Sequence, residues 1–368
     1  MGNRAQIAWV AAAWAVFTIG ALWLTRSGVS LDTDSAMRLV QVRDLLHGQN
    51  WFDIVQHRMN APYGLAMHWS RLVDAPLALL MLVSERFALT VWPLLLFGAV
   101  LVLLARIAQA LGGFSAMVTA LLLTLLCTEI YDVFSPGNID HHGLQLALML
   151  AALLGVVEKR PVLAGMACAL GLCVGLESLP YVLVAIAAAS FWLRDQPKLA
   201  RPFGLAVAVT AMILLVAVCA YRTQPVCDSY SLLYAGLLAI GGGGLAVLSS
   251  LRRHRLAGLA VLAIVLLAFA ALLNPACFAG PYAGMDARMR TLFLARINEA
   301  RPVWDFARLA PSQTVGGYFY ALFALVLCFF APPGRRKWTV IAFAAVALLI
   351  AGFQFRGVAF ALLFALPG

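Results

Sequence analysis

The chain has few charged residues. Asp, Glu, Lys and Arg together make up 11% of its 368 residues, whereas 63% are hydrophobic, and soluble domains are usually about a quarter charged. This composition excludes a soluble fold. No stretch between the apolar runs is long enough to bury a core of its own. We therefore expect residues 1–368 to form a single membrane domain.

Several familiar patterns are also missing. The seven cysteines form no C-x-x-C pair and no cluster with the spacing of a zinc site, so most are expected to be small core residues. No obvious cleavage site accompanies the first apolar run, which predicts that this run stays as a membrane anchor. Gly241–Gly244 is not followed by the Lys-Ser/Thr of a phosphate-binding loop, so close helix packing is the better interpretation.

Long apolar runs dominate the rest of the sequence, and a membrane-spanning helix needs about 20 such residues. The runs cover residues 6–25, 89–109, 115–131, 143–157, 162–177, 180–193, 203–221, 231–250, 256–274, 315–331 and 338–353, and a twelfth begins after Arg356. The sequence thus predicts an all-α, polytopic membrane protein with about 11 to 12 transmembrane helices. Amphipathic helices are expected in its first long loop.

The basic residues indicate how the chain is oriented. One set of connections holds Arg4, Arg106, Lys159, Arg160, Arg194, Lys198, Arg201, Arg252, Arg253, Arg255, Arg335, Arg336 and Lys337. Because only Glu158 and Asp195 accompany them, this side is predicted to be cytoplasmic, with the amino terminus. The long loops 26–88 and 275–313 then face the outside, the periplasm of a bacterial inner membrane. The positive charge is thus a signal of topology, and we expect membrane lipids and no nucleic acid as partners.

The first outer loop carries two aspartates, Asp32 and Asp34, before an amphipathic stretch that includes Leu39 and Val42. One aspartate is expected to cap that helix. The other is then free, and two carboxylates at a helix start also suit a hard divalent cation that keeps positions open for phosphate oxygens. Both interpretations stay open.

The second outer loop contains Asp140-His141-His142. Acids and histidines at the edge of a membrane helix are costly unless they are solvated or paired. A solvated helix cap is one interpretation. The other is that Asp140 and His142 converge on one ion while His141 points elsewhere, and that Asp34 joins them in a site for Mn²⁺ or Mg²⁺.

Other polar residues lie at the same predicted face. Glu299 stands between Arg296 and Arg301, where it is either a surface ion pair or a positioned acid among cations that suit phosphate oxygens. Glu177, at a span end, is either a simple terminus or lines the cavity of Asp140. Cys227 and Cys277 are the cysteines placed in outer loops, where a disulfide between them is permitted.

The order of these motifs resembles the catalytic subunit of the oligosaccharyltransferases, which have the GT-C membrane fold. The resemblance rests on Asp34, then Asp140-His141-His142, then Ile297-Asn298-Glu299-Ala300-Arg301-Pro302, then Arg356 at the start of a late run. It implies that Asp34, Asp140 and His142 are metal ligands. It also implies that Glu299 contacts the acceptor, and that Arg356, with His141, binds a polyprenyl-linked sugar donor.

The implied reaction is a metal-assisted, inverting sugar transfer at the outer membrane face, with Glu299 or Asp34 positioning the nucleophile. The family's carboxy-terminal soluble domain, with its Trp-Trp-Asp signature, has no counterpart in these residues. The acceptor is therefore left open as a protein, a lipid or a glycan, and a GT-C transferase that modifies a lipid or a cell-surface polysaccharide is an alternative. An ion-coupled transporter is the alternative from another class.

Overall fold

The computed structural model describes residues 3–251, 253–280, 285–292 and 294–368. It is 77% helical, and its strands form one short hairpin of β1 (Val55–Gln56) and β2 (Leu65–Ala66). The prediction of an all-α membrane protein is confirmed. Arg252, which we assigned to the cytoplasmic side, and part of the 275–313 loop lie outside the described residues.

Helices form over every predicted apolar run. They are α1 (Asn3–Leu24), α4 (Glu85–Leu125), α6 (His142–Val157), α7 (Pro161–Val174), α8 (Leu179–Asp195), α9 (Pro197–Ala217), α10 (Leu232–Ser250), α11 (Arg255–Leu273), α15 (Tyr320–Cys328), α16 (Arg335–Phe353) and α17 (Val358–Ala365). Within the described residues, seven helical segments are long and apolar enough to span a membrane. The predicted number was larger because α4 joins two runs across a break at Gly113 (φ 76°, ψ −157°). In addition, α6, α7 and the stretch Phe355–Ala365 are shorter apolar helices.

Contacts within the chain define two compact units. Unit 1 comprises Met1–Ser30, Leu89–Asn138 and Met285–Gly368, and unit 2 comprises Leu31–Ala88 and Ile139–Gly284. That residues 1–368 form one domain stays a prediction.

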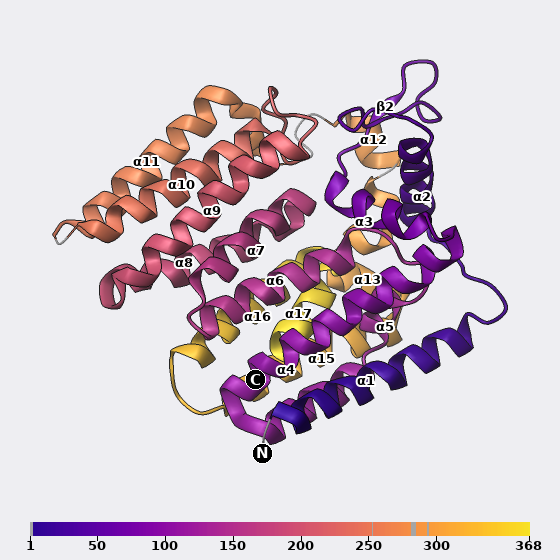
Figure 1. The fold of residues 1–368 in the computed structure, drawn as a ribbon, viewed down its shortest axis with the longest axis horizontal. Coiled ribbons are helices and arrows are strands. Elements are labelled where there is room, and N and C mark those ends of the chain that lie inside the picture. Colours follow the sequence, from indigo (N-terminus) through magenta and orange to yellow (C-terminus); the bar gives the residue numbers. More distant parts are fainter. Residues whose placement is uncertain (1–2, 252, 281–284, 293) are drawn as a thin grey trace. The chain divides into compact units, whose positions relative to one another are not determined.

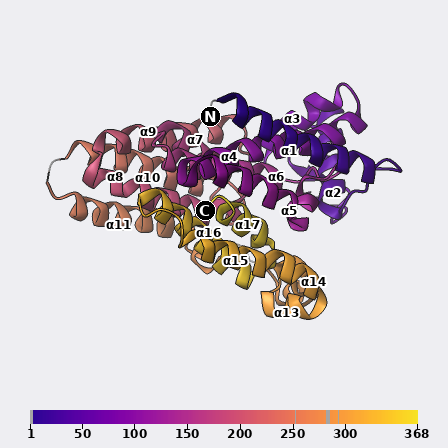
Figure 2. The same cartoon turned by 90° about the horizontal axis from the view of Figure 1, so that it is seen from below.

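Unit 2 contains a stack of apolar helices. Helix α6 packs against α7, α7 against α9 and α9 against α10, and α11 lies against α10 (Figures 1 and 2). Glycines allow the backbones to approach closely: a Cβ atom on Gly242 of α10 would collide with the carbonyl oxygen of Gly204 in α9. The Gly241–Gly244 run therefore serves helix packing, as predicted.

The first outer loop folds onto unit 2 as two helices, α2 (Thr33–Leu46) and α3 (Arg71–Met81). Asp74 of α3 accepts hydrogen bonds from Arg38 at 2.8 Å, Arg71 at 3.0 Å and Gln41 at 2.6 Å. The side chains of Asp74 and both arginines are completely buried. Because α2 contributes Arg38 and Gln41, this network ties α2 to α3.

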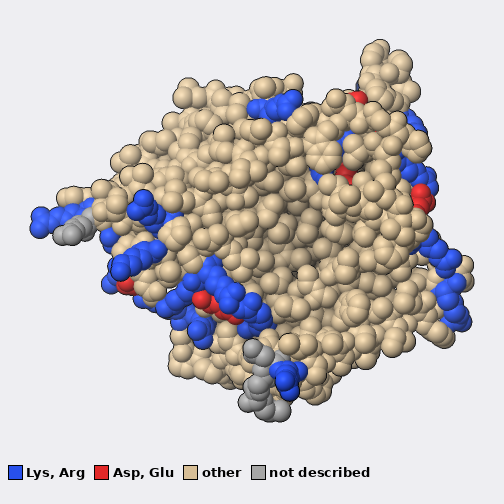
Figure 3. Space-filling view, in the orientation of Figure 1, with Lys and Arg blue, Asp and Glu red and all other residues tan. Residues whose placement is uncertain are grey.

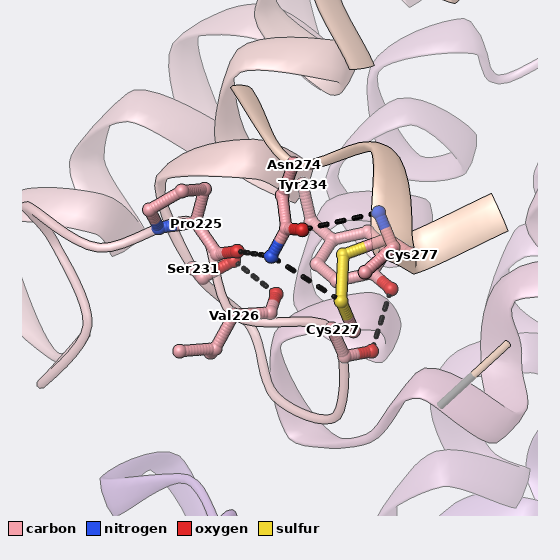
Figure 4. Close-up of a disulfide and its surroundings, with 8 residues drawn as sticks. Pro225, Val226, Cys227, Ser231, Tyr234, Asn274 and Cys277 are labelled. Atoms are coloured by element: carbon pink, nitrogen blue, oxygen red, sulfur yellow. Dashed lines mark hydrogen bonds between the residues drawn. A yellow bond between two sulfur atoms is a disulfide. The ribbon is translucent and has the colours of Figure 1, made fainter. Parts of the chain in front are cut away.

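A disulfide joins Cys227, in the connection between α9 and α10, to Cys277 in the 3₁₀ turn η2 (Pro275–Ala279), with 5.1 Å between the Cα atoms (Figure 4). The prediction of this bond is confirmed. Asn274 Nδ2 donates to the Pro225 carbonyl at 2.7 Å, and the Tyr234 hydroxyl donates to the Cys227 carbonyl at 2.8 Å. These contacts hold the two connections together.

Unit 1 combines α1 and most of α4 with the short α5 (Thr128–Phe134) and the carboxy-terminal part of the chain. The rings of Phe17, Phe97 and Phe134 pack in its core. The remaining elements are α12 (Ala287–Leu292), the 3₁₀ turns η3 (Leu294–Arg296) and η4 (Asn298–Ala300), α13 (Val303–Leu309), α14 (Pro311–Thr314), the π-helix η5 (Val315–Phe319) and the 3₁₀ turn η6 (Phe355–Gly357).

The molecular surface fits a membrane setting. Figure 3 shows a broad area without Lys, Arg, Asp or Glu. Large hydrophobic side chains such as Leu256, Leu272 and Phe330 are more than four-fifths exposed. In water such exposure would be unfavourable, whereas lipid chains cover it without cost.

Candidate functional site

The second outer loop brings three potential metal ligands together just before and at the start of α6. The ligand atoms of Asp140, His141 and His142 lie within 4.8 Å of one another. Among the residues that the structure describes, these three form the one group of three or more His, Cys, Asp or Glu side chains that could hold a metal ion. Asp140 accepts hydrogen bonds from the His142 backbone amide at 2.8 Å, and its other oxygen lies 2.6 Å from His142 Nδ1. We call Asp140, His141 and His142 the ligand cluster.

His141 belongs to this cluster, so the expectation that it points elsewhere is wrong. Its ring centroid lies 4.3 Å from that of His142. The reason is local: α6 begins at His142, and His141 is its N-cap residue. Successive side chains within a helix point in different directions, but His141 precedes the helix, so this rotation does not separate the two rings.

Asp34 approaches the same region from the first outer loop. It lies in the first turn of α2, and the hydroxyl of its neighbour Ser35 accepts a hydrogen bond from the amide of Ile139 at 3.1 Å. This bond joins residues 104 positions apart and places the start of α2 beside the segment that leads into Asp140. Asp34 is not within the 4.8 Å group. Asp32 caps α2 by accepting from the Ser35 amide at 2.6 Å.

Glu177 lies next to the ligand cluster, in the 3₁₀ turn η1 (Leu176–Ser178) between α7 and α8. Its Oε1 lies 3.8 Å from His141 Nε2, and its Oε2 accepts a hydrogen bond from Gln145 Nε2 at 3.1 Å. The structure thus gathers two acids and two histidines from two separate segments of unit 2.

The surroundings favour an ionised Asp140. Burial alone raises the pKa of Asp140, but the charge and hydrogen bonds of His142 outweigh burial and hold this pKa below its usual value. Burial lowers the pKa of His68, and the nearby His141 lowers it further. An ionised carboxylate beside imidazoles is a donor set that fits Mn²⁺ or Zn²⁺ well and Mg²⁺ less well.

Two residues near the cluster were not predicted to be there. The Trp69 ring lies 6.3 Å from the His141 ring, and the guanidinium of Arg38 stacks 4.5 Å from the Trp69 ring centroid. Arg38 lies four residues after Asp34, and hence on the same face of α2, which was the available signal. Nothing in the sequence marks Trp69.

Unit 1 contains the predicted donor and acceptor residues. Arg356 Nη2 lies 3.9 Å from Glu299 Oε1, and the Phe355 amide donates to the Arg301 carbonyl at 3.0 Å. The Arg356 side chain is 16% exposed and that of Glu299 51%. Arg296 is also exposed. The structure therefore brings together Glu299, Arg301 and Arg356, and their placement around a metal stays a prediction.

Comparisons with known proteins find the fold but no close relative. No protein-family model matches the sequence, and no curated protein does. The archaeal oligosaccharyltransferase AglB from Archaeoglobus fulgidus, in complex with an inhibitory peptide and a dolichol-phosphate, superposes with a TM-score of 0.74 at 12% identity over 98% of this chain and 49% of its own.

Two further structures of the A. fulgidus oligosaccharyltransferase agree. One is tethered to an acceptor peptide containing the NVT sequon and has a TM-score of 0.71 at 13% identity, covering 100% of this chain and 49% of that one. The other, a complex with Zn and sulfate, has a TM-score of 0.59 at 14% identity, covering 96% and 48%. The chain has the GT-C fold of these enzymes and spans about half of their length.

Proposed function

We propose that this chain, which has the GT-C fold of the oligosaccharyltransferases, is a membrane glycosyltransferase. It moves a sugar or oligosaccharide from a polyprenyl-(di)phosphate donor to an acceptor at the outer face of the membrane, with inversion at the anomeric carbon. The main support is the ligand cluster, which lies beside the start of α2 that carries Asp34. The A. fulgidus enzyme binds dolichol-phosphate and an acceptor peptide on the same fold.

The ligand set of unit 2 supports the proposal of a divalent cation. Asp34, Asp140 and His142 would hold Mn²⁺ or Mg²⁺. When bound, such an ion neutralises charge that develops on the departing phosphate. The carboxylates suit either ion, and the imidazole favours Mn²⁺.

The residues of unit 1 bind the sugar donor and the acceptor. The guanidinium of Arg356 is suited to grip phosphate oxygens with two parallel hydrogen bonds. Its 3.9 Å contact with Glu299 is long enough for donor oxygens to compete for it. Glu299 then orients the acceptor nucleophile and accepts its proton. Arg296 and Arg301 add positive charge for the same anionic donor.

The proposed site faces the periplasm, with the amino terminus in the cytoplasm. Substrates then reach the charged residues of the outer loops, including the ligand cluster, from the periplasm. The apolar tail of the donor lies among lipids against the helices. The acceptor is a protein, a lipid or a glycan.

The test is to purify the full chain in detergent and to offer it radiolabelled polyprenyl-linked sugars with Mn²⁺. Consumption of one donor, its loss with EDTA and its return with Mn²⁺ are the expected results. Boiled protein is the control. Failure to consume any donor, together with cation-driven solute uptake by proteoliposomes, would replace the transferase with a transporter.

A further inference from the structure

The Nδ1 atom of His141, in the ligand cluster, has no hydrogen-bond partner among the residues that the structure describes. His141 is 5% exposed, and its Nδ1 is buried without a hydrogen bond. Leaving a buried polar atom unsatisfied is energetically costly. Because that atom belongs to a residue of the ligand cluster, the missing partner is expected to be a ligand that the cluster binds.

We infer that His141 is itself a ligand of the divalent cation, through Nδ1, and that Glu177 is the positioning residue that orients it. This inference rests on the proposed metal site. To the set Asp34, Asp140 and His142 it adds His141 as a ligand, in place of the donor-binding role that the resemblance implies, and Glu177 as its positioning residue.

The two nitrogens of His141 face different surroundings. Nε2 lies 3.8 Å from Glu177 Oε1. Nε2 faces this carboxylate, and Nδ1 is the ring nitrogen left for a bound ligand. A carboxylate behind a metal-bound histidine fixes the tautomer and the ring orientation and makes the ligand more basic.

Glu177 is itself held in place. Gln145 is completely buried, and its Nε2 donates to Glu177 Oε2 at 3.1 Å and to Ser178 Oγ at 3.3 Å. A Cβ atom at Gly175 would come within 2.7 Å of Glu177 Oε2 and would collide with the Gln145 amide. The glycine leaves the space in which glutamine, glutamate and histidine line up.

The consequence is metal selectivity. Two imidazoles with carboxylates favour Mn²⁺, Co²⁺ or Zn²⁺ over Mg²⁺, which prefers an all-oxygen shell. We therefore expect the chain to bind Mn²⁺ in the presence of an excess of Mg²⁺.

The test measures metal binding without donor or acceptor. Co²⁺ is titrated into the metal-stripped full chain in detergent and followed by its visible absorption and by calorimetry. Glu177→Gln is expected to weaken metal binding by about 10- to 100-fold, because it changes the carboxylate that orients the ligand His141. His141→Asn is expected to weaken it at least as much and to change the absorption spectrum. His57→Asn, which changes an exposed histidine of the first outer loop, is the matched control.

The double variant separates positioning from direct binding. If Glu177 acts through His141, adding Glu177→Gln to His141→Asn leaves Kd unchanged, whereas an additional loss would show that Glu177 acts independently. Wild-type Kd and spectrum in His141→Asn would overturn the inference. Pulsed EPR of the Mn²⁺-loaded wild type needs no variant: nitrogen couplings from two imidazoles support the inference, and couplings from one contradict it.

Failure here is distinguishable from failure of the proposed function. A chain that binds Co²⁺ through His141 and consumes no lipid-linked sugar keeps this inference and loses the transferase. A chain that transfers sugar and binds metal equally well without His141 does the reverse.

Discussion

The two units differ in how their polar residues are held. In unit 2, Asp140 and His141 are at least nine-tenths buried, and they lie at helix starts tied by hydrogen bonds. In unit 1, Glu299 is 51% exposed, and it lies in a 3₁₀ turn within an irregular segment. One region collects acids and imidazoles, and the other collects arginines around a single glutamate.

The two regions therefore suit different ligands. A metal needs its ligands fixed in advance, because small displacements weaken coordination. A long flexible lipid-linked anion and its acceptor are better met by residues that adjust as they bind. Substitutions in the two units are therefore expected to fail in different ways.

The largest expected effect is that of Asp140→Asn. Transfer should fall by about 1000-fold, because a bound cation contributes several kcal/mol to the stabilisation of developing charge. Metal content, measured by mass spectrometry of the purified protein, should fall with it. Glu299→Gln is the control from unit 1 and should keep its metal. Loss of metal in Glu299→Gln would break the division between the units.

The second effect concerns stability. Asp74→Asn leaves the buried guanidinium groups of Arg38 and Arg71 without their carboxylate, and removing one partner of a buried ion pair costs about 3–5 kcal/mol. Thermal unfolding in detergent measures the loss. The control is Asp305→Asn, which removes an exposed pair with Arg308 in unit 1 and should cost about 1 kcal/mol or less. Equal shifts would contradict the buried network.

The third effect is that of the disulfide. It closes a separation of 50 residues between Cys227 and Cys277, and such a bond typically stabilises by about 2–4 kcal/mol. Reductant should therefore lower the unfolding temperature and change the mobility of the wild-type chain on non-reducing gels. The double variant Cys227→Ser/Cys277→Ser should not respond to reductant. An equal response would place the effect elsewhere.

The smallest effect is that of Arg356→Ala. A hydrogen bond to a charged group contributes about 1.5–3 kcal/mol, so KM for the lipid-linked donor should rise about 10- to 100-fold. Metal affinity should stay unchanged. Glu299→Gln should show the opposite pattern, with KM for the donor retained and kcat reduced. Steady-state kinetics at varied donor concentration measure both, and unchanged kinetics in both variants would remove these residues from the reaction.

Most of the fold can be predicted from the sequence because every membrane-spanning segment must satisfy its backbone hydrogen bonds internally, which favours a helix. Twenty apolar residues without charges predict a helix, and the structure places a helix over each such run. Span number was harder to predict. Helices α6 and α7 have 16 and 14 residues, and a single glycine, Gly113, separates the two halves of α4.

The candidate site was readable only where its residues are neighbours in sequence. Asp140, His141 and His142 are adjacent, so their grouping needs no tertiary information. The contact of Glu177 with His141 depends on α7 ending at Val174, with Gly175 as its C-cap, and on the turn that follows. Arg38 and Asp74 form a buried pair, and no local sequence pattern predicts a partner 36 residues away.

The Arg38, Arg71 and Asp74 network has a consequence for the charge around the ligand cluster. Two guanidinium groups share one carboxylate, so a positive charge is left over in this buried contact. Arg38 stacks on Trp69, whose ring also neighbours that of His141. The first outer loop thus contributes a net positive charge to the part of unit 2 that holds Asp140 and Glu177.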